Sequence, residues 1–256
     1  MVQSVKRTLI ILKALGNMNN KSSLAEISDH VGLPPSTVHR LLNTLKEANF
    51  VSQDEGTNKY YLGPALISLG IEAGNYLDIR RTAYPILESM AKETEEDSYL
   101  SIVDGNYGII IETVAGPHPL KIIGPPQSRV PLHAGAARKI LLAYQSDEFI
   151  NNYVYNDLKQ ITGQTITNQQ ELLLHLKDIR EKGYATSLSE HLIDASGVSA
   201  PVFDGIGNFV GGVGILGPSI RMTLDKQSAL IKSVKKHALE LSMALGYDPM
   251  INYTNM

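Results

Sequence analysis

Six polar side chains between residues 36 and 44 are spaced so that they share the outer face of one short helix. They are Ser36, Thr37, His39, Arg40, Asn43 and Thr44. Hydroxyl groups near a helix N-terminus suit phosphate oxygens, and the bidentate geometry of Arg and Asn suits guanine and adenine edges respectively. No acidic side chain interrupts this face before Glu47. The pattern indicates the chemistry of nucleic-acid recognition.

The preceding residues predict the scaffold that would present this face. Ser23 and Glu26 have capping-box spacing, and the helix that they begin ends at Gly32. Ser28 is small enough to face a second helix at a steep crossing angle. The apolar anchors of that second helix recur with helical period at Val38, Leu41, Leu42 and Leu45. Two short helices joined by a tight turn at 32–35 predict a helix-turn-helix.

Two strand-like segments, 50–53 and 59–62, flank a polar turn and predict a β-hairpin wing. We expect Asn58 and Lys59 of this wing to contact the DNA backbone or minor groove, and Lys21 to contact phosphates. The alternative is a helical hairpin that only packs against its neighbours, because polar outer faces are common.

Composition excludes several classes of protein. The chain has 256 residues, of which 43% are hydrophobic and 19% charged, so it suits one large domain or two modest ones. The absence of Cys excludes disulfides, thiolate nucleophiles and Cys-ligated metals, and predicts a cytoplasmic location. Lys13 interrupts the apolar run 8–12, which predicts an amphipathic helix rather than a signal peptide. The run 209–216 is too short to span a membrane.

Charge is distributed unevenly along the chain, although the formal net charge is only -3. Residues 1–63 hold seven Lys and Arg against five Asp and Glu, whereas residues 64–256 hold sixteen against twenty-one. If any part of the chain contacts an anionic polymer, it is the first quarter.

The remaining three quarters alternate strand-like and helix-like segments. Residues 64–93 are helical in pattern, with breaks near Asp78 and Pro85, and we expect them to link two domains. Strands are expected at 99–103, 108–114, 120–123, 184–189, 197–203 and 209–216, and helices at 133–143, 168–182 and 224–245. Strands and helices interleaved around antiparallel hairpins predict an α+β domain.

Two patterns that suggest cofactors or metals have simpler explanations. The G-x-G-x-x-G of residues 212–217 lies within a strand-like run and ends at Pro218, so it predicts a close-packed strand rather than a dinucleotide site. The seven histidines lack metal-binding spacing. We expect no cofactor, no metal and no enzymatic activity, although a cavity shared by His133 and Glu190 leaves a cryptic enzyme as an alternative.

Several segments resemble IclR-type transcriptional regulators, in the same order along the chain. Residues 4–9, 33–42 and 60–63 are similar to that family's winged helix-turn-helix, and residues 131–134, 139, 162–167, 183–185, 190 and 200–204 to its effector-binding domain. The resemblance implies a multi-domain α+β protein. Its parts would be a winged helix-turn-helix at 1–63, a helical linker at 64–93 and a GAF-like effector-binding domain at 94–250.

This resemblance also implies a function and a set of partners. The expected protein is a transcriptional regulator, more commonly a repressor in this family, whose affinity for a double-stranded DNA operator is adjusted by a small organic acid. RNA polymerase is a further expected partner. A charge of +2 in residues 1–63 is too small for tight binding alone, so a homodimer or homotetramer is expected. The alternative is a small-molecule-binding module or enzyme whose helical N-terminus mediates assembly.

By the same resemblance, the effector would bind in a pocket walled by segments 133–139, 187–190, 195–199 and 213–216. The implied residues are His133, Ala136, Ala137, Arg138, Ser187, Glu190, Ala195, Gly197, Ser199, Gly214 and Leu216. Because a helix N-terminus favours negative charge, a carboxylate is a reasonable ligand for this pocket.

The chain departs from the family pattern inside this pocket. Arg138 replaces a Gly of many members, Gly197 replaces a Cys or polar residue, and Gly214 and Leu216 replace serines. More space and fewer hydroxyl groups predict an effector that is bulkier or less polar than a two- or three-carbon acid. Arg138 would either bind its carboxylate or point to solvent.

Overall fold

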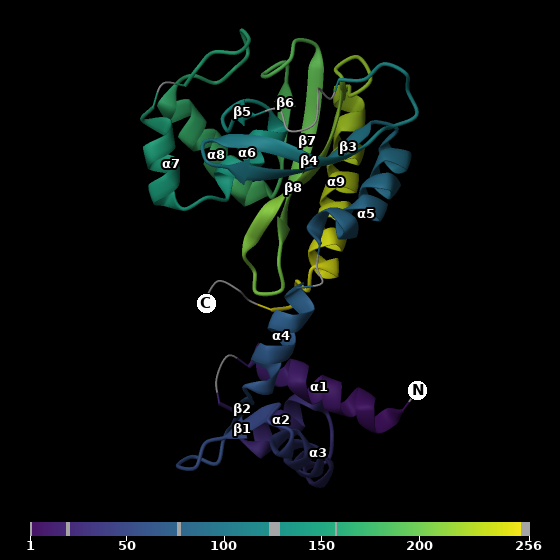
Figure 1. Cartoon of the computed structure of the whole chain (residues 1–256), viewed down its shortest axis with the longest axis vertical. Helices are drawn as coiled ribbons and strands as arrows, with labels where there is room; N and C mark the ends of the chain where they lie inside the picture. Colours follow the sequence, from purple (N-terminus) through teal and green to yellow (C-terminus); the bar gives the residue numbers. More distant parts are fainter. Residues whose placement is uncertain (1, 19–20, 76–77, 123–128, 157, 252–256) are drawn as a thin grey trace. The chain divides into compact units, whose positions relative to one another are not determined.

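The computed structural model describes residues 2–18, 21–75, 78–122, 129–156 and 158–251 (Figure 1). The chain divides into two compact units, of which Asp78–Asp248 form the second. Among the described residues, no helix combines the length and the apolar character that crossing a bilayer requires. Each unit is described separately below.

The first unit is a helical domain with a small hairpin. Its elements are α1 (Gln3–Asn17), α2 (Leu24–Val31), α3 (Pro35–Glu47), β1 (Val51–Gln53), β2 (Tyr60–Leu62) and α4 (Ala65–Asn75). The predicted capping box is confirmed, because Ser23 accepts from the Glu26 N–H while Glu26 accepts from the Ser23 N–H. Gly32 ends α2 in the left-handed conformation, with φ 64°. Strands β1 and β2 pair antiparallel and form the predicted wing.

The core of the first unit fixes the angle between α2 and α3. Ser28 is buried at 4% exposure on α2, where its small side chain lets the two helices approach closely. The buried apolar side chains come from all three N-terminal helices and the wing: Ile11, Leu15, Ile27, Val38, Leu42, Leu45, Val51 and Tyr60. One face of α3 is therefore held inward, and the opposite face is free for contacts.

The second unit is built on one antiparallel sheet of six strands. Its elements are α5 (Ile79–Thr94), β3 (Asp97–Asp104), β4 (Tyr107–Val114), β5 (Val130–Pro131), α6 (Ala136–Ala143), α7 (Asp147–Val154), α8 (Gln169–Lys182), β6 (Ala185–Leu188), β7 (Ala195–Phe203), β8 (Phe209–Pro218) and α9 (Leu224–Ala244). The strand order is β5-β4-β3-β8-β7-β6. The fold is α+β.

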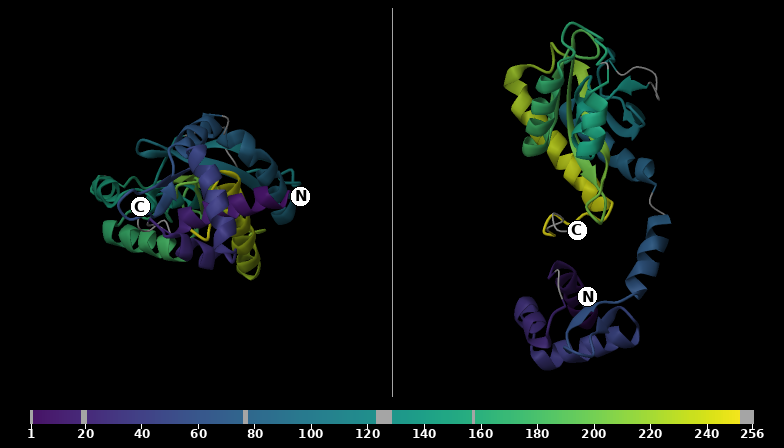
Figure 2. Two further views of the ribbon diagram at one scale, coloured as in Figure 1. Left: turned by 90° about the horizontal axis from the view of Figure 1, so that it is seen from below. Right: turned by 90° about the vertical axis from the view of Figure 1, so that its left-hand side faces the viewer.

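Alternation along the central strands gives the sheet two different faces. Leu100 and Val198 belong to an apolar cluster with residues of α5 and α9. Their chain neighbours Tyr99, Gly197 and Ser199 point to the opposite face, which α6 covers. Figure 2 shows α9 on one side of the sheet and the group of α6 and α8 on the other. The second unit therefore has three layers, and the candidate pocket lies between the sheet and α6.

Glycines of β8 allow this close packing. A Cβ at Gly212 would lie 2.7 Å from a methyl group of Ile140 on α6, and a Cβ at Gly214 would lie 2.5 Å from the Tyr99 hydroxyl. Both glycines lie inside the strand rather than before a helix. The interpretation of the G-x-G-x-x-G as a close-packed strand is confirmed.

Three expectations for the second unit were incomplete or wrong. Breaks in the helical pattern were expected near Asp78 and Pro85. Asp78 is the N-cap residue of α5, but the helix continues through Pro85 without a break. Residues 120–122 form no strand, and the Lys121 ammonium instead binds Asp97 and the Gly116 carbonyl; residue 123 lies outside the described residues. The sequence reading also missed α7 and the short strand β5.

Candidate functional site

The outer face of α3 carries the six side chains proposed to contact DNA. Ser36, His39, Arg40 and Thr44 are exposed, and Thr37 and Asn43 are half-buried. No ion pair involves Arg40 in the described part of the chain, so its guanidinium is available to a ligand. The Thr44 hydroxyl differs from the others because it donates to the Arg40 carbonyl at 3.2 Å.

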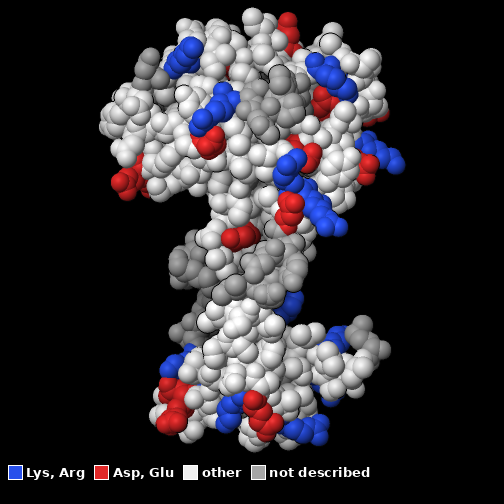
Figure 3. Space-filling model, in the orientation of Figure 1, with Lys and Arg blue, Asp and Glu red and all other residues white. Residues whose placement is uncertain are grey.

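The two residues of the wing that are predicted to contact DNA, Asn58 and Lys59, lie in the turn directly before β2. Asn58 is exposed with φ 54°, a conformation that Asn tolerates better than most residues, and its carbonyl accepts from Gln53. Lys59 is half-buried. The surface of the first unit shown in Figure 3 carries both basic and acidic side chains rather than one uniform patch.

Lys21 already has an acidic partner. Its ammonium donates to the Asp54 carboxylate and lies 5.1 Å from the centre of the Tyr61 ring. Asp54 also accepts from the backbone N–H and hydroxyl of Thr57. The hydrogen bonds from Lys21 and Thr57 hold the pKa of the Asp54 carboxyl well below its usual range. In this conformation Asp54 compensates the charge that Lys21 would offer to a phosphate.

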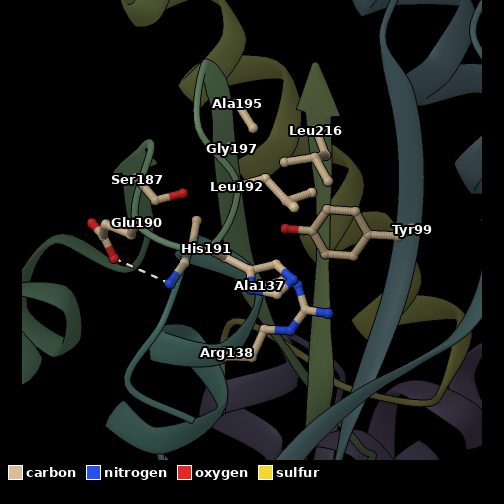
Figure 4. Close-up of a pocket in the computed structure, with 12 residues that line it drawn as sticks. Tyr99, Ala137, Arg138, Ser187, Glu190, His191, Leu192, Ala195, Gly197 and Leu216 are labelled. Carbon is tan, nitrogen blue, oxygen red and sulfur yellow. Dashed lines mark hydrogen bonds between the residues drawn. The ribbon is translucent and has the colours of Figure 1, made fainter. Parts of the chain in front are cut away.

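A cavity in the second unit lies where the effector pocket was expected (Figure 4). Eight predicted residues line it: Ala136, Ala137, Arg138, Ser187, Glu190, Ala195, Gly197 and Leu216. Tyr99, Gly135, His191 and Leu192 also line it. The cavity volume is about 20 Å³, which is room for about one water molecule. A larger ligand therefore requires the walls to move.

Three predicted pocket residues lie behind the walls of the cavity. His133 is 2% exposed and its ring nitrogens contact the Tyr153 hydroxyl at 2.8 Å and the Lys159 carbonyl at 3.0 Å. The Ser199 hydroxyl donates to the Val213 carbonyl at 3.0 Å. Gly214 lies directly under Tyr99.

The extra space predicted from the glycines is not present. The phenol of Tyr99 fills the position that a side chain at Gly214 would take. A Cβ at Gly197 would lie 3.3 Å from the Ser187 hydroxyl and 3.4 Å from a methyl group of Leu216, so this position is also closely packed. The missing serine hydroxyls are replaced in part by the hydroxyl of Tyr99, whose pKa burial raises to about 12.

Sequence reasoning missed Tyr99 because its role depends on strand pairing. Tyr99 of β3 lies opposite Gly214 of β8, and this pairing joins segments more than a hundred residues apart. Gly135 could have been noticed in the sequence, because a glycine near the start of a predicted helix indicates a positive φ. Gly135 is the N-cap residue of α6, and its φ is 88°. His191 and Leu192 belong to an irregular segment, which has no periodicity that could assign a direction to a side chain.

Glu190, which lines the cavity, forms a buried ion pair. Lys139 is completely buried, and its ammonium donates to Glu190 at 2.5 Å. The second oxygen of Glu190 accepts from the Gly135 N–H at 3.1 Å, and the hydroxyls of Thr162 and Thr165 donate to the Glu190 carbonyl. Burial lowers the pKa of Lys139, and Glu190 opposes this shift. Glu190 is thus engaged by Lys139 rather than by His133.

Arg138 points into the protein and not to solvent. Only 6% of its surface is exposed, and its Nε has no hydrogen-bond partner within the described residues. Figure 4 shows its guanidinium beside the ring of Tyr99. The possibility that Arg138 points to solvent is therefore wrong, and its binding of a carboxylate stays a prediction. No group of three His, Asp or Glu side chains in the described ranges could hold a metal.

Two half-buried histidines are expected to make the second unit sensitive to acid. Burial, with the charges of Lys139 and Arg138 as smaller causes, lowers the pKa of His175 and of His191 from 6.5 to about 4. Below pH 6.5 the unfolded chain binds protons that the folded chain does not. The free energy of unfolding should therefore decrease from pH 6.5 to about 4.

Melting temperatures measured across this range by calorimetry test the expectation. The variant His175→Gln/His191→Gln should lose less stability than the parent, whereas His30→Gln, which changes an exposed histidine, should follow the parent. Parallel curves for the double variant and the parent would contradict the assignment.

Comparison with known proteins identifies both units. The family model described as the IclR helix-turn-helix domain matches residues 4–55, and the model described as the bacterial transcriptional regulator IclR C-terminal matches residues 72–243. The first match contains α2 and α3, and the second contains the cavity.

Whole proteins are similar over nearly the full chain. The HTH-type transcriptional regulator KipR of Bacillus subtilis is 30% identical, with 96% of this chain and 100% of KipR covered. The HTH-type transcriptional repressor AllR of Escherichia coli is 29% identical, with 95% and 90% covered. A crystal structure of a putative IclR regulator from Silicibacter sp. has a TM-score of 0.90 at 22% identity, covering 98% and 100%, and thus shares the fold. The chain belongs to the IclR family of bacterial transcriptional regulators.

Proposed function

We propose that this protein is a sequence-specific repressor that binds its operator through α3 and the wing and releases it in response to a small organic acid. The observation that carries the proposal is the outer face of α3, where exposed polar side chains surround an Arg40 without an acidic partner. Ser36, Thr37, His39, Asn43 and Thr44 would contact bases or phosphates beside it. Asn58, Lys59 and Lys21 would contact the DNA backbone.

Arg138 supports an acidic effector, because it is buried and forms no ion pair with any residue that the structure describes. An IclR homologue from Microbacterium hydrocarbonoxydans, 18% identical with a TM-score of 0.60, has been solved in complex with 4-hydroxybenzoate. We assign the effector of this chain to the same broad class, a small organic acid, and place it in the cavity. The name of the relative AllR supports repression rather than activation.

A second apolar face on α1 supports assembly into a dimer or tetramer. Ile11 and Leu15 of α1 are buried in the first unit, but Val2, Val5 and Leu9 lie on the opposite side at 65%, 55% and 55% exposure. A second copy that covered this stripe would double the number of phosphate contacts. Within the proposal, residues 1–63 bind DNA, 64–93 link and 94–250 bind the effector. The protein acts in the cytoplasm with RNA polymerase and carries out no catalysis.

Arg40→Ala is expected to weaken operator binding by about 1–3 kcal/mol, because it removes a guanidinium able to form a bidentate pair with a base. Gel shifts with the DNA upstream of the protein's own gene measure this affinity. A steep negative slope of log K against log salt for the parent would identify phosphate contacts.

Arg81→Ala is the matched control, since it removes the same charge from an exposed position on α5. Equal affinities for Arg40→Ala, Arg81→Ala and the parent would remove Arg40 from the interface. A flat salt dependence of the parent would favour the alternative of an assembly domain.

Asp54→Asn is expected to increase DNA affinity several-fold and to steepen the salt dependence by about one unit, because it releases Lys21 for a phosphate contact. Asparagine retains an acceptor for Thr57, so the turn of the wing is preserved. Glu55→Gln is the control, because it removes an exposed negative charge from the next residue and so measures the effect of the change in overall charge alone. If both variants change the salt slope equally, Asp54 has no specific effect on Lys21.

A further inference from the structure

The charge of Glu190, which lines the cavity, is compensated by Lys139 behind the wall. Lys139 and Glu190 are 2.5 Å apart and both are at least nine-tenths buried. Both oxygens of Glu190 are already engaged, one by the Lys139 ammonium and the other by the Gly135 N–H. Together these groups add no net charge to the cavity.

Arg138 adds a positive charge that no neighbour compensates. No carboxylate forms an ion pair with it among the residues that the structure describes, and its buried Nε lacks any acceptor. Burial lowers the pKa of Arg138, but an arginine side chain stays protonated in proteins. Since an unpaired buried charge is strongly unfavourable, an anion at this position would stabilise the protein.

The other titratable groups facing Arg138 are neutral near pH 7. The pKa of His191 is lowered to about 4 by burial and by Arg138 itself. The pKa of Tyr99 is raised to about 12 by burial. Among the described residues the cavity therefore carries a net charge of one, and a second carboxylate on a ligand would find no free cation.

The site has one polar end and one apolar end. At the polar end, Arg138 stands in the first turn of α6, where the backbone N–H groups of Ala136 and Ala137 have no acceptor within the helix. Leu192 and Leu216 form the apolar end, on the other side of the Tyr99 side chain in Figure 4. The Tyr99 hydroxyl contacts the Ser199 hydroxyl and donates to the Val198 carbonyl at a long 3.5 Å, a weak bond that it could exchange for one to a ligand between the two ends.

One wall of the cavity is irregular and could admit the ligand. Segment 189–194 connects β6 to β7, and its end residues Ser189 and Asp194 have φ values of 55° and 58°. Its side chains include Glu190, His191 and Leu192, which line the cavity, and Leu192 is 40% exposed. The remaining lining residues belong to α6, to strands or to the turn before α6. Displacement of the His191 and Leu192 side chains is the change that enlarges the cavity without loss of regular structure, and it leaves Glu190 in its pair with Lys139.

We infer that the cavity selects singly charged acids, with one carboxylate bound by Arg138 and an uncharged, largely apolar remainder placed against Leu192 and Leu216. This inference rests on the proposed function, in which the cavity is the effector site. Arg138 is then the residue that determines specificity for one negative charge. A diacid of the same length is excluded because its second carboxylate would lie against Leu192 and Leu216 without a cation, and a neutral amide is excluded because it does not compensate Arg138.

Isothermal titration calorimetry on the full-length protein compares three probes of equal chain length: hexanoate, adipate and hexanamide. Benzoate is a second monoacid of different shape. The expected result is that at least one monoacid binds at least about tenfold more tightly than adipate and hexanamide. Arg138→Gln should abolish this preference, whereas Arg81→Gln should retain it. The melting temperature of unliganded Arg138→Gln should equal or exceed that of the parent, because the variant removes an uncompensated buried charge.

The inference would be overturned if adipate bound more tightly than the monoacids or if hexanamide bound as tightly as they do. It would also be overturned if neither monoacid bound, or if Arg138→Gln kept the preference for a monoacid. Gel shifts with the upstream DNA are run on the same samples. If the protein shifts the DNA but the acids give one of these contradicting results, the inferred selectivity for monoacids is wrong and the proposed DNA-binding function is retained. If no DNA shifts, the proposed function fails whichever acid binds.

Discussion

Lys139→Met is expected to destabilise the second unit by about 3–5 kcal/mol, because it leaves the buried carboxylate of Glu190 without its cation. Lys139 is completely buried at the centre of α6, so no water can replace its ammonium. Differential scanning calorimetry of the full chain measures the effect as a lowered melting transition of the second unit.

Two further variants separate the loss of the pair from a general effect of removing lysine. Lys139→Met/Glu190→Gln removes both charges but retains an acceptor for the Gly135 N–H, and it should recover most of the loss. Lys182→Met breaks an exposed pair with Asp178 and should cost no more than about 1 kcal/mol. If Lys139→Met proves as mild as Lys182→Met, the buried pair has little importance for stability.

Gly214→Ala is expected to destabilise the second unit by about 1–3 kcal/mol, because one methyl group would overfill the packing between β8 and Tyr99. The added Cβ would clash with the Val198 carbonyl and lie 2.5 Å from the Tyr99 hydroxyl. The backbone carbonyl belongs to the neighbouring strand β7 and cannot rotate away. Urea titration followed by circular dichroism measures the change.

Gly197→Ala is the matched control, because it makes the same substitution on the adjacent strand next to the same cavity. The nearest atom to its new methyl group would be the Ser187 hydroxyl at 3.3 Å, at the end of a side chain that can turn. Its effect should be clearly smaller. Similar losses for the two variants would contradict the close approach of Tyr99 to Gly214.

Features encoded by neighbouring residues could be predicted from the sequence. The capping box of Ser23 and Glu26, the turn at Gly32 and the face of α3 depend on spacings of three or four residues, and the structure contains all three. Helix α7 was readable too, since Ser146 caps it and Asp147 follows in its first turn, but the eight residues were too few to stand out.

Features that depend on tertiary packing could not be predicted. Pro85 normally interrupts a helix, yet packing of Ala83 and Leu87 against the sheet holds α5 continuous across it. The burial of Arg138 follows from the position of α6 on the sheet, which no local pattern encodes. The pairing of β3 with β8 places Tyr99 in the cavity. Its side chain occupies the space that was predicted to be empty because residue 214 is a glycine.

The alternation along β3 and β7 gives the second unit a short mechanical connection. Tyr99 lines the cavity while the next residue, Leu100, packs with α5 on the opposite face, and Gly197 lines the cavity while Val198 of β7 lies on the face that α9 covers. Only the thickness of one sheet therefore separates the cavity from α5 and α9. If the proposed effector binds there, a shift of Tyr99 would reach α5, the first helix after the boundary between the units, without a long relay of side chains.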